Sequence, residues 1–272
     1  MKRIVLLIMI MLCVMVCFGC GKKDASRNMI TVNDEYVSEY FKKAGKSVSE
    51  SKEKIKLIEF MEKEYEAEYS ESGTSYTLPY TFDYYKAGKN TFELSADTDE
   101  VIQFRSELYF DEDKRNATLP ILSEDELKDK ADSYAKKFID IEEYQVSVEN
   151  KTDYKAYKYT YTRYIDGYET SDRFAVALSD RGEIIFYSNS LMRNIKYVSL
   201  EGFDKEKAYE AVKEVLKEQY PDADPDTFEP DREILTLTED NEVAFYYLAT
   251  VVIFYGSGGE EIREAVPVRL IW

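Results

Sequence analysis

The sequence contains no histidine, and its three cysteines all lie within the first 20 residues. Without histidine the chain cannot form a Ser-His-Asp or Cys-His catalytic group, and it lacks the side chain typical of zinc sites. It also lacks the group that usually titrates near neutral pH. Because no cysteine follows Cys20, the remaining chain has neither a disulfide nor a thiol nucleophile. These absences exclude the histidine-dependent hydrolases and the usual zinc sites.

Other catalytic signatures are also missing. The sequence has no Gly-rich phosphate loop, no Ser-x-x-Lys motif and no nucleophile elbow. Because acidic residues are so frequent, their number neither excludes a glycosidase-like pair of catalytic carboxylates nor shows where such a pair would lie. We therefore assign no catalytic, cofactor-binding or metal-binding residue, and we expect a protein that is not an enzyme.

The chain is strongly acidic, with 36 Lys and Arg against 54 Asp and Glu and a net charge of −18. Such a polyanion repels nucleic acid and anionic lipid headgroups. We therefore expect neutral, basic or cationic partners. A hydrophobic content of 44%, with 24 Tyr and 14 Phe, provides enough apolar material for folded domains, and the length allows two or three small ones.

The N-terminus has the features of a secretory signal. Lys2 and Arg3 precede an apolar run from Ile4 to Phe18, and Gly19 and Cys20 follow. This arrangement resembles the lipobox of bacterial lipoproteins. The resemblance implies that residues 1–19 are removed and that lipidated Cys20 anchors the protein on the extracytoplasmic face of the cell membrane.

Two residues depart from the lipobox pattern. Cys17 stands where the family usually has leucine, and Phe18 is bulky for its position. The alternative is an uncleaved transmembrane helix, although the apolar run is at the short end of the roughly 17–25 residues that a span needs. Both interpretations place the rest of the chain outside the cytoplasm.

Helical periodicity appears in several places. After a polar linker, residues 20–47 end in a predicted short lead-in helix with Val37, Tyr40, Phe41 and Ala44 on one face. A further helix is predicted from Ser49 as the cap. Its apolar positions follow at helical spacing: Ile55, Ile58, Met61 and Tyr65.

Two later helices have clearer boundaries. Ser123 and Glu126 form a predicted capping box, and Leu122 with Leu127 forms a hydrophobic staple. The apolar face of this helix comprises Leu127, Ala131, Tyr134, Ala135 and Phe138. The other helix begins near Asp204, after Phe203, and Pro221 ends it.

Two similar β-hairpins are predicted at 90–106 and 172–188. They align at one constant offset without a gap. Phe92, Ile102, Phe104 and Ser106 match Phe174, Ile184, Phe186 and Ser188. The second hairpin turns at Ser179-Asp180-Arg181-Gly182, and the first at Ala96 to Asp99. A helix followed by a hairpin therefore indicates an internal repeat.

A third copy is predicted after Asp204. A long strand from Val243 to Tyr255 is followed by a turn at Gly256 to Gly259 and a returning strand from Ile262 to Ile271. Pro267 suits an edge strand, because proline cannot donate a ladder hydrogen bond. This copy ends one strand short, which leaves an edge that another chain could complete.

The residues from Tyr161 to Asn189 resemble the PepSY-like units of extracytoplasmic bacterial proteins, including the tandem YcdB/YcdC form. Here an aromatic strand, an Asp-Gly turn and two further strands follow a capped helix. The resemblance implies an α+β, cystatin-like fold of tandem units, each a helix on an antiparallel sheet. It divides the chain into a degenerate helix-plus-hairpin unit (48–118), a PepSY-like unit (119–198) and a shorter second one (199–272). It brings no catalytic motif.

One segment has the spacing of a calcium loop. Asp222, Asp224, Asp226 and Glu233 occupy positions 1, 3, 5 and 12. However, Thr227 stands where the loop requires glycine, and Pro225 and Pro230 stiffen the segment. The missing glycine favours a solvated acidic connector.

Two aromatic stretches could bind ligands or fill the core. Tyr157, Tyr159 and Tyr161 alternate on one strand face, where they could stack on sugars or peptides, but the alternation favours a packed sheet face. Phe245 to Tyr255 is apolar on both faces, which indicates a doubly buried strand or one face packed on a partner.

Taken together, these patterns predict a lipid-anchored, non-enzymatic binding or regulatory protein. It would restrain another extracytoplasmic protein, such as a surface peptidase or a sensor, with no nucleic-acid partner. The alternative is a lipoprotein that binds a small ligand, a cation or a cell-wall fragment.

Overall fold

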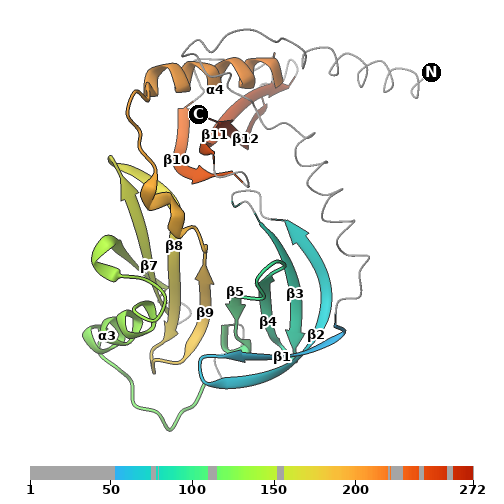
Figure 1. The fold of residues 1–272 in the computed structure, drawn as a ribbon, viewed down its shortest axis with the longest axis vertical. Helices are drawn as coiled ribbons and strands as arrows, with labels where there is room; N and C mark the ends of the chain where they lie inside the picture. The colour runs from blue at the N-terminus through green and yellow to red at the C-terminus, as the bar shows by residue number, and fades with distance from the viewer. Residues whose placement is uncertain are drawn as a thin grey trace, which may run out of the picture.

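The computed structural model describes residues 53–74, 78, 80–109, 115–151, 156–219, 221, 229–238, 242–255 and 260–271. The predicted signal, Cys20 and the lead-in helix lie outside these ranges. Within them, no helix is long and apolar enough to cross a membrane. The fold is α+β, with two α-helices and one large sheet in the described part (Figure 1).

The first described segment is an antiparallel meander, in which each strand pairs with the next. Its strands are β1 (Ile55–Phe60), β2 (Lys63–Thr74), β3 (Thr81–Ala87), β4 (Asn90–Ser95) and β5 (Val101–Arg105). A short 3-10 helix, η2 (Glu107–Tyr109), follows.

The helix predicted after Ser49 is wrong over the described residues. Ile55 and Ile58 lie in β1, whereas Tyr65 lies in β2. Met61 and Glu62 form a tight turn between them with positive φ values of 49° and 66°, a left-handed conformation that ends a helix. The buried side chains alternate with period two, because Ile58 and Phe60 face the core. The unit predicted at 48–118 therefore has no α-helix in its described part.

The second segment contains one α-helix and four strands. Its elements are α3 (Glu124–Ala135), η4 (Ile141–Glu143), β6 (Gln145–Lys151), β7 (Ala156–Ile165), β8 (Tyr168–Ser179), β9 (Ile184–Asn189) and η6 (Arg193–Tyr197). The strands again form an antiparallel meander. This order confirms the helix and the hairpin predicted for 119–198.

The third segment contains α4 (Lys205–Gln219), β10 (Glu229–Leu237), β11 (Val243–Tyr255) and β12 (Glu260–Ile271). The three strands are antiparallel. In the described part this segment has three strands, whereas the second has four. Pro267 lies in β12, which pairs only with β11 among the described strands, so the edge position predicted for it is confirmed.

One sheet links all three segments. β5 pairs with β9, joining the first meander to the second, and β8 pairs with β10 in parallel through Thr170 and Leu235. Within the described part, β1 lies at one end of the sheet and β12 at the other. β6 pairs only with β7, which pairs with β8, and so forms a third edge. The outermost strands are therefore β1, β6 and β12.

Both helices begin as predicted. Ser123 Oγ accepts a hydrogen bond from the Glu126 backbone N–H, and the Glu126 carboxylate accepts one from Ser123 N–H at 2.8 Å. The staple residues Leu122 and Leu127 both pack in the core. At α4, Asp204 accepts a hydrogen bond from the Lys207 backbone N–H at 3.1 Å.

Two apolar cores stabilise this arrangement. The larger core joins residues of β1 to β5 with those of β7 to β9 and with α3, which packs on β8 and β7 (Figure 1). Phe60 lies against both Phe104 of β5 and Tyr187 of β9, with ring centres 4.8 and 5.0 Å apart. The smaller core lies beneath α4, where Phe203 stacks on Phe245 at 4.3 Å.

The two predicted hairpins are both present, but their aligned residues do not all share a face. Phe92 and Phe174 both lie in the larger core, as does Phe104. Phe186, the counterpart of Phe104, instead packs with a separate cluster. The strands flanking the two turns differ in register, with bulges at different positions. A shift of one residue sends a side chain to the opposite face of a sheet.

Candidate functional site

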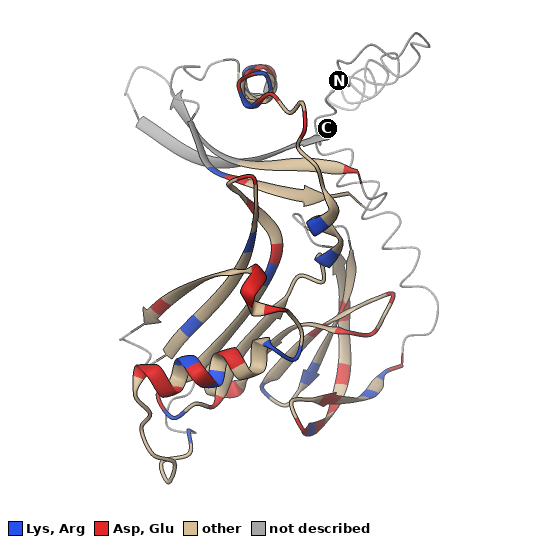
Figure 2. Cartoon of the chain, turned by 60° about the vertical axis from the view of Figure 1, so that its left-hand side comes forward, with Lys and Arg blue, Asp and Glu red and all other residues tan. Residues whose placement is uncertain are grey.

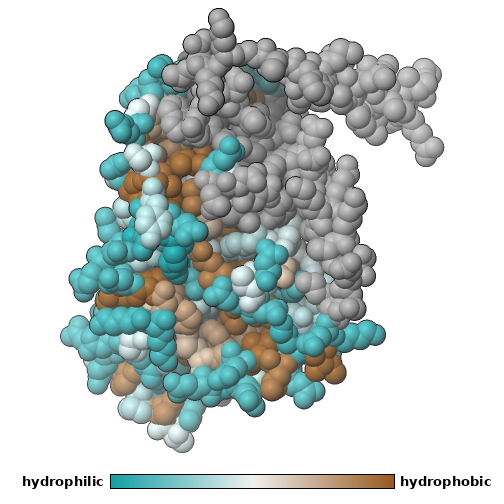
Figure 3. Space-filling view, in the orientation of Figure 1, coloured by the Kyte–Doolittle hydropathy of each residue, from teal (hydrophilic) through white to brown (hydrophobic). Residues whose placement is uncertain are grey.

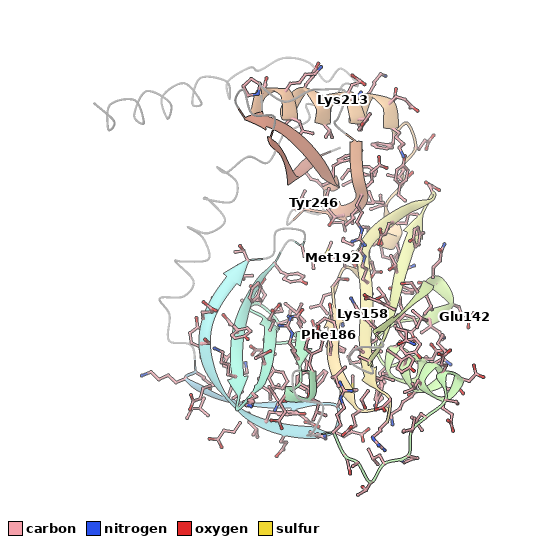
Figure 4. The ribbon with its side chains drawn as sticks, turned by 180° about the vertical axis from the view of Figure 1, so that it is seen from behind. Glu142, Lys158, Phe186, Met192, Lys213 and Tyr246 are labelled. Atoms are coloured by element: carbon pink, nitrogen blue, oxygen red, sulfur yellow. The ribbon has the colours of Figure 1, made fainter. Side chains whose placement is uncertain are left out.

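The tyrosine stripe on β7 belongs to the core. Tyr159 and Tyr161 are buried, and the Tyr161 hydroxyl donates a hydrogen bond to Asp132 of α3. This confirms the packed sheet face that the alternation predicted. Lys158 projects from the opposite face, where its Nζ lies 5.8 Å from the centre of the Phe186 ring (Figure 4).

The predicted calcium loop lies largely outside the described residues. Of its four carboxylates only Glu233 is described, and it pairs with Lys205 Nζ at 3.0 Å. No group of three or more potential metal ligands occurs among the described side chains. For the other three carboxylates, the absence of a metal site stays a prediction.

The start of β11 is buried on one face and partly buried on the other, where Ala244 is fully buried. Phe245 and Tyr247 pack beneath α4, whereas Tyr246, on the other face, is half-buried (Figure 4). Burial raises the pKa of Tyr246 above its ordinary value. The side chains beyond Tyr247 in this strand lie outside the described residues, so the second face of the strand stays a prediction there.

Sequence reasoning missed a buried carboxylate, Asp172 of β8. Its side chain is fully buried and accepts hydrogen bonds from Arg163 Nε at 2.9 Å, from Tyr144 Oη at 2.7 Å and from Arg193. A buried charge is costly unless it is paired and hydrogen-bonded. Asp172 meets this requirement with two guanidinium groups and one hydroxyl.

The electrostatics of this network follow from its contacts. Burial raises the pKa of Tyr144 to about 12, and its hydrogen bond to Asp172 acts in the same direction. Burial alone would lower the pKa of Arg163, but hydrogen bonds to Asp172 and Glu143 raise it overall. The hydrogen bond from Arg163, 2.6 Å long, lowers the pKa of the Glu143 carboxyl.

The Asp172 network holds the beginning of β6 in place. Glu143 ends η4, and Tyr144 directly precedes the first residue of β6. Both side chains bind Arg163, which stands at a bulge of β7. Its guanidinium also lies 4.5 Å from the centre of the Tyr144 ring. The network therefore fixes the chain at the point where it enters the outermost strand of this side of the sheet.

An open cleft of about 620 Å³ lies where the β7–β8 turn, the first residue of α4 and β10 meet. Its lining comprises Tyr164, Asp166, Gly167, Tyr168, Glu169, Lys205, Arg232 and Glu233. Arg232 binds Glu169 through two hydrogen bonds of 3.0 and 2.6 Å, and Lys205 pairs with Glu233. These charges largely neutralise one another.

The surface is otherwise mixed. Acidic and basic residues both occur along α3, which begins with acidic ones (Figure 2), and apolar residues interrupt the hydrophilic surface of the described face (Figure 3). The exposed apolar side chains include two pairs on outermost strands. Ile55 and Leu57 lie on β1, and Val146 and Val148 on β6.

Open strand edges with exposed apolar side chains can accept another chain as an added strand. Sequence reasoning predicted such an edge only after residue 199. The alternation of valine with polar residues in β6 was the signal that could have found the edge on the second segment. No family model, curated protein or solved structure matches this chain significantly.

Proposed function

We propose that this protein is a lipoprotein anchored through Cys20 on the extracytoplasmic face of the membrane, where it binds and restrains another protein. The partner would be a surface peptidase or a sensor, and the binding protein itself would do no catalysis. The observation that carries this proposal is the outermost strand β6, which pairs only with β7 among the described strands and displays Val146 and Val148 to solvent.

The arrangement of elements supports the proposed family. A helix followed by antiparallel strands occurs twice, at α3 to β9 and at α4 to β12. Both helices pack on the strands that follow them. This order agrees with tandem PepSY-like, cystatin-like units, for which binding or inhibition is the role that the resemblance implies.

Charge supports a protein partner with a basic face. The net charge of −18 opposes association with nucleic acid. Complementary charge on a partner would raise the association rate and discriminate against acidic proteins. The anchor would concentrate the acidic domain at the membrane surface.

The proposal can be tested by cross-linking in intact cells that express either the wild-type chain or Cys20→Ala, followed by mass spectrometry. We expect one membrane or surface protein to be recovered with the wild type and lost with Cys20→Ala, because the variant cannot be lipidated. Repeated failure of the wild type to recover any protein would contradict the proposal.

The second candidate, binding of a small ligand, a cation or a cell-wall fragment, is favoured by the cleft beside the β7–β8 turn, which Tyr164 and Tyr168 line. A ligand specific to the folded state raises the melting temperature. Melting curves with Ca²⁺, basic peptides and wall fragments therefore test this candidate. An unchanged midpoint with all three would count against it.

A further inference from the structure

We propose that β6 and the adjoining flank of α3 form a binding surface for an extended segment of the partner, which adds to the sheet as a strand. The segment would carry apolar side chains at alternate positions and lysine or arginine at its ends. This inference rests on the proposed function and assigns it a site and a partner chemistry.

No described strand pairs with the outer edge of β6 at any point along its length. All seven residues pair with β7, from Gln145 opposite Thr162 to Lys151 opposite Ala156. The other side of β6 has no partner among the described strands. In an antiparallel pair, alternate residues direct their backbone N–H and C=O groups away from the partner strand. These outward groups can bind one further strand.

The apolar part of this binding surface lies on the α3 side of the sheet. Val146 stands opposite Tyr161 and Val148 opposite Tyr159, so each pair shares a face. The tyrosines are buried in the core that includes α3, whereas Val146 and Val148 expose 38% and 54% of their surfaces. Cover by the helix therefore ends between β7 and β6. An added strand would bury both valines.

Exposure rises steadily along this stripe. Tyr144, on the same face two residues before Val146, is buried by the larger core and by the Asp172 network. The apolar stripe is thus covered at Tyr144 and exposed toward Val148. Because the network already fixes this end of β6, little ordering of the edge is required on binding, which favours affinity.

Charge around this binding surface favours a basic occupant. On the α3 flank, Lys128 is paired with Asp132 at 2.6 Å, which leaves the negative charge of the nearby Glu124 available to a partner. Glu124 lies close enough to Tyr159 to contribute to the raised pKa of that residue, after the larger effect of burial. Glu142 of η4, before the start of β6, is also exposed (Figure 4). Cationic ends on the added strand would meet these carboxylates.

The exposed apolar pair on β1 differs from that on β6. Ile55 and Leu57 stand opposite Glu68 and Glu66, on the face away from the buried Ile58. No described helix flanks this face. Ile55 exposes 56% of its surface, nearly the same as Val148, and both lie on outermost strands. Ile55 therefore provides a matched control position.

Binding can be measured with the full chain in detergent and two fluorescent heptapeptides. The basic probe is Lys-Thr-Val-Thr-Val-Thr-Lys, and the acidic probe replaces both lysines with glutamate. We expect the basic peptide to bind at least about tenfold more tightly at low salt, and this preference should shrink as salt screens the charges. Equal affinities, or no saturable binding of the basic peptide up to about 1 mM, would overturn the inference.

Substitution locates the site. Val148→Ser should weaken binding of the basic peptide about fivefold, because an apolar contact of roughly half a valine surface is lost. Ile55→Ser should leave affinity within about twofold. An unchanged affinity for Val148→Ser would overturn the assignment to β6, even if cellular cross-linking still recovers a partner and the proposed function stands.

Backbone pairing is tested with N-methylated versions of the basic peptide. One version carries methyl groups on the odd-numbered amides and the other on the even-numbered amides. Because an added strand donates hydrogen bonds from only one edge, one version should lose binding while the other keeps it. If both versions bind equally well, the peptide does not add as a strand and the inference fails.

Discussion

Asp172 shows how a single buried charge can organise a surface. Its carboxylate receives donors from β7, from η6 and from the residue that precedes β6. Losing one member of a buried ion network leaves the others charged and unpaired, which costs far more than an exposed ion pair contributes. The stability of the β6 end should therefore depend on this residue.

Asp172→Asn is predicted to lower the free energy of unfolding by about 3 kcal/mol, because the largely buried Arg163 and the partly buried Arg193 would lose the anion that they share. Urea denaturation measures this change. The matched variant Asp97→Asn, at an exposed turn position, should change stability by less than about 0.5 kcal/mol. Similar costs for the two variants would contradict the structural role of Asp172.

The tyrosines predict an alkaline limit to stability. Burial raises the pKa values of Tyr85, Tyr159 and Tyr187 to about 12, from an ordinary value of 10. A pKa that is raised in the folded state means that ionisation favours unfolding. The stability that these neutral tyrosines contribute is therefore fully present below pH 10 and is lost as pH rises toward 12.

We therefore expect the unfolding free energy to be nearly constant between about pH 6 and pH 9, where histidine would otherwise titrate, and to fall above pH 10. Denaturation measured across this range, with tyrosinate absorbance recorded in parallel, checks both parts. Tyrosine ionisation that is complete below pH 11 without any loss of structure would contradict the burial of these rings.

The local sequence pattern was sufficient to predict that the tyrosine stripe is buried, but it was not sufficient to predict that Asp172 is buried. Alternation places Tyr159 and Tyr161 on one face whatever the partner strand is. The partners of Asp172 lie in separate elements, and a polar Thr-Ser-Asp-Arg stretch looks exposed in sequence. Only the tertiary arrangement brings Tyr144, Arg163 and Arg193 to the same carboxylate.

At the scale of elements, α3 depends on its N-terminal cap. Ser123→Ala should cost about 1 kcal/mol, because Ser123 Oγ no longer accepts a hydrogen bond from the Glu126 N–H or donates one to the Glu126 carboxylate. The matched substitution Ser133→Ala lies within the helix, where serine only bonds back to Lys130 O. It should be neutral or slightly stabilising. Thermal melting of both variants compares them, and equal effects would argue against the cap.

The β8–β9 turn depends on Gly182, whose φ is +76°. A Cβ there would lie 2.8 Å from both Leu122 Cδ1 and Lys130 Cδ, so alanine would strain the backbone and force these two side chains to move. At Gly167, where φ is +85°, an added Cβ would have no described atom within 4 Å. Gly182→Ala should therefore destabilise more than Gly167→Ala, which carries only the backbone cost of about 1 kcal/mol. The reverse order in urea denaturation would contradict this packing.

Elements with strong local signals were predicted correctly. The capped helices and the two hairpins have turn residues and caps that specify their ends. The prediction of a helix around Ile58 was wrong because the spacing of the apolar residues at positions 55, 58 and 61 is ambiguous. This spacing fits a helical period, and it fits equally well a hairpin whose turn lies at Met61 and Glu62. Pairing with β3 and burial of Phe60 decide in favour of strands.

At the scale of the whole molecule, one sheet connects segments that the sequence presents as successive units. Pairing of β5 with β9, and the contact of Phe60 with Tyr187, give the first two segments a common core. Such pairings join residues far apart along the chain, and no local pattern encodes them. Helix and hairpin order could be predicted, whereas the continuity of the sheet could not.

This continuity determines which edges remain open. β9 is covered by β5, and part of β8 is covered by β10, so these strands accept no further chain where they pair. The outermost strand β6 carries Val146 and Val148 at one side of the larger core. A tether at Cys20 would hold this edge near the membrane surface, where it could meet the partner repeatedly.

The most direct test of the account is site-specific photocross-linking in intact cells, with p-benzoylphenylalanine replacing Val148 in one strain and Ile55 in another. The account predicts one cross-linked membrane or surface protein from position 148, much less from position 55, and none from position 148 when Cys20→Ala is combined with it. Efficient cross-linking from position 55 with none from position 148 would contradict β6 as the binding edge, and no cross-linked protein from either position would contradict the binding function itself.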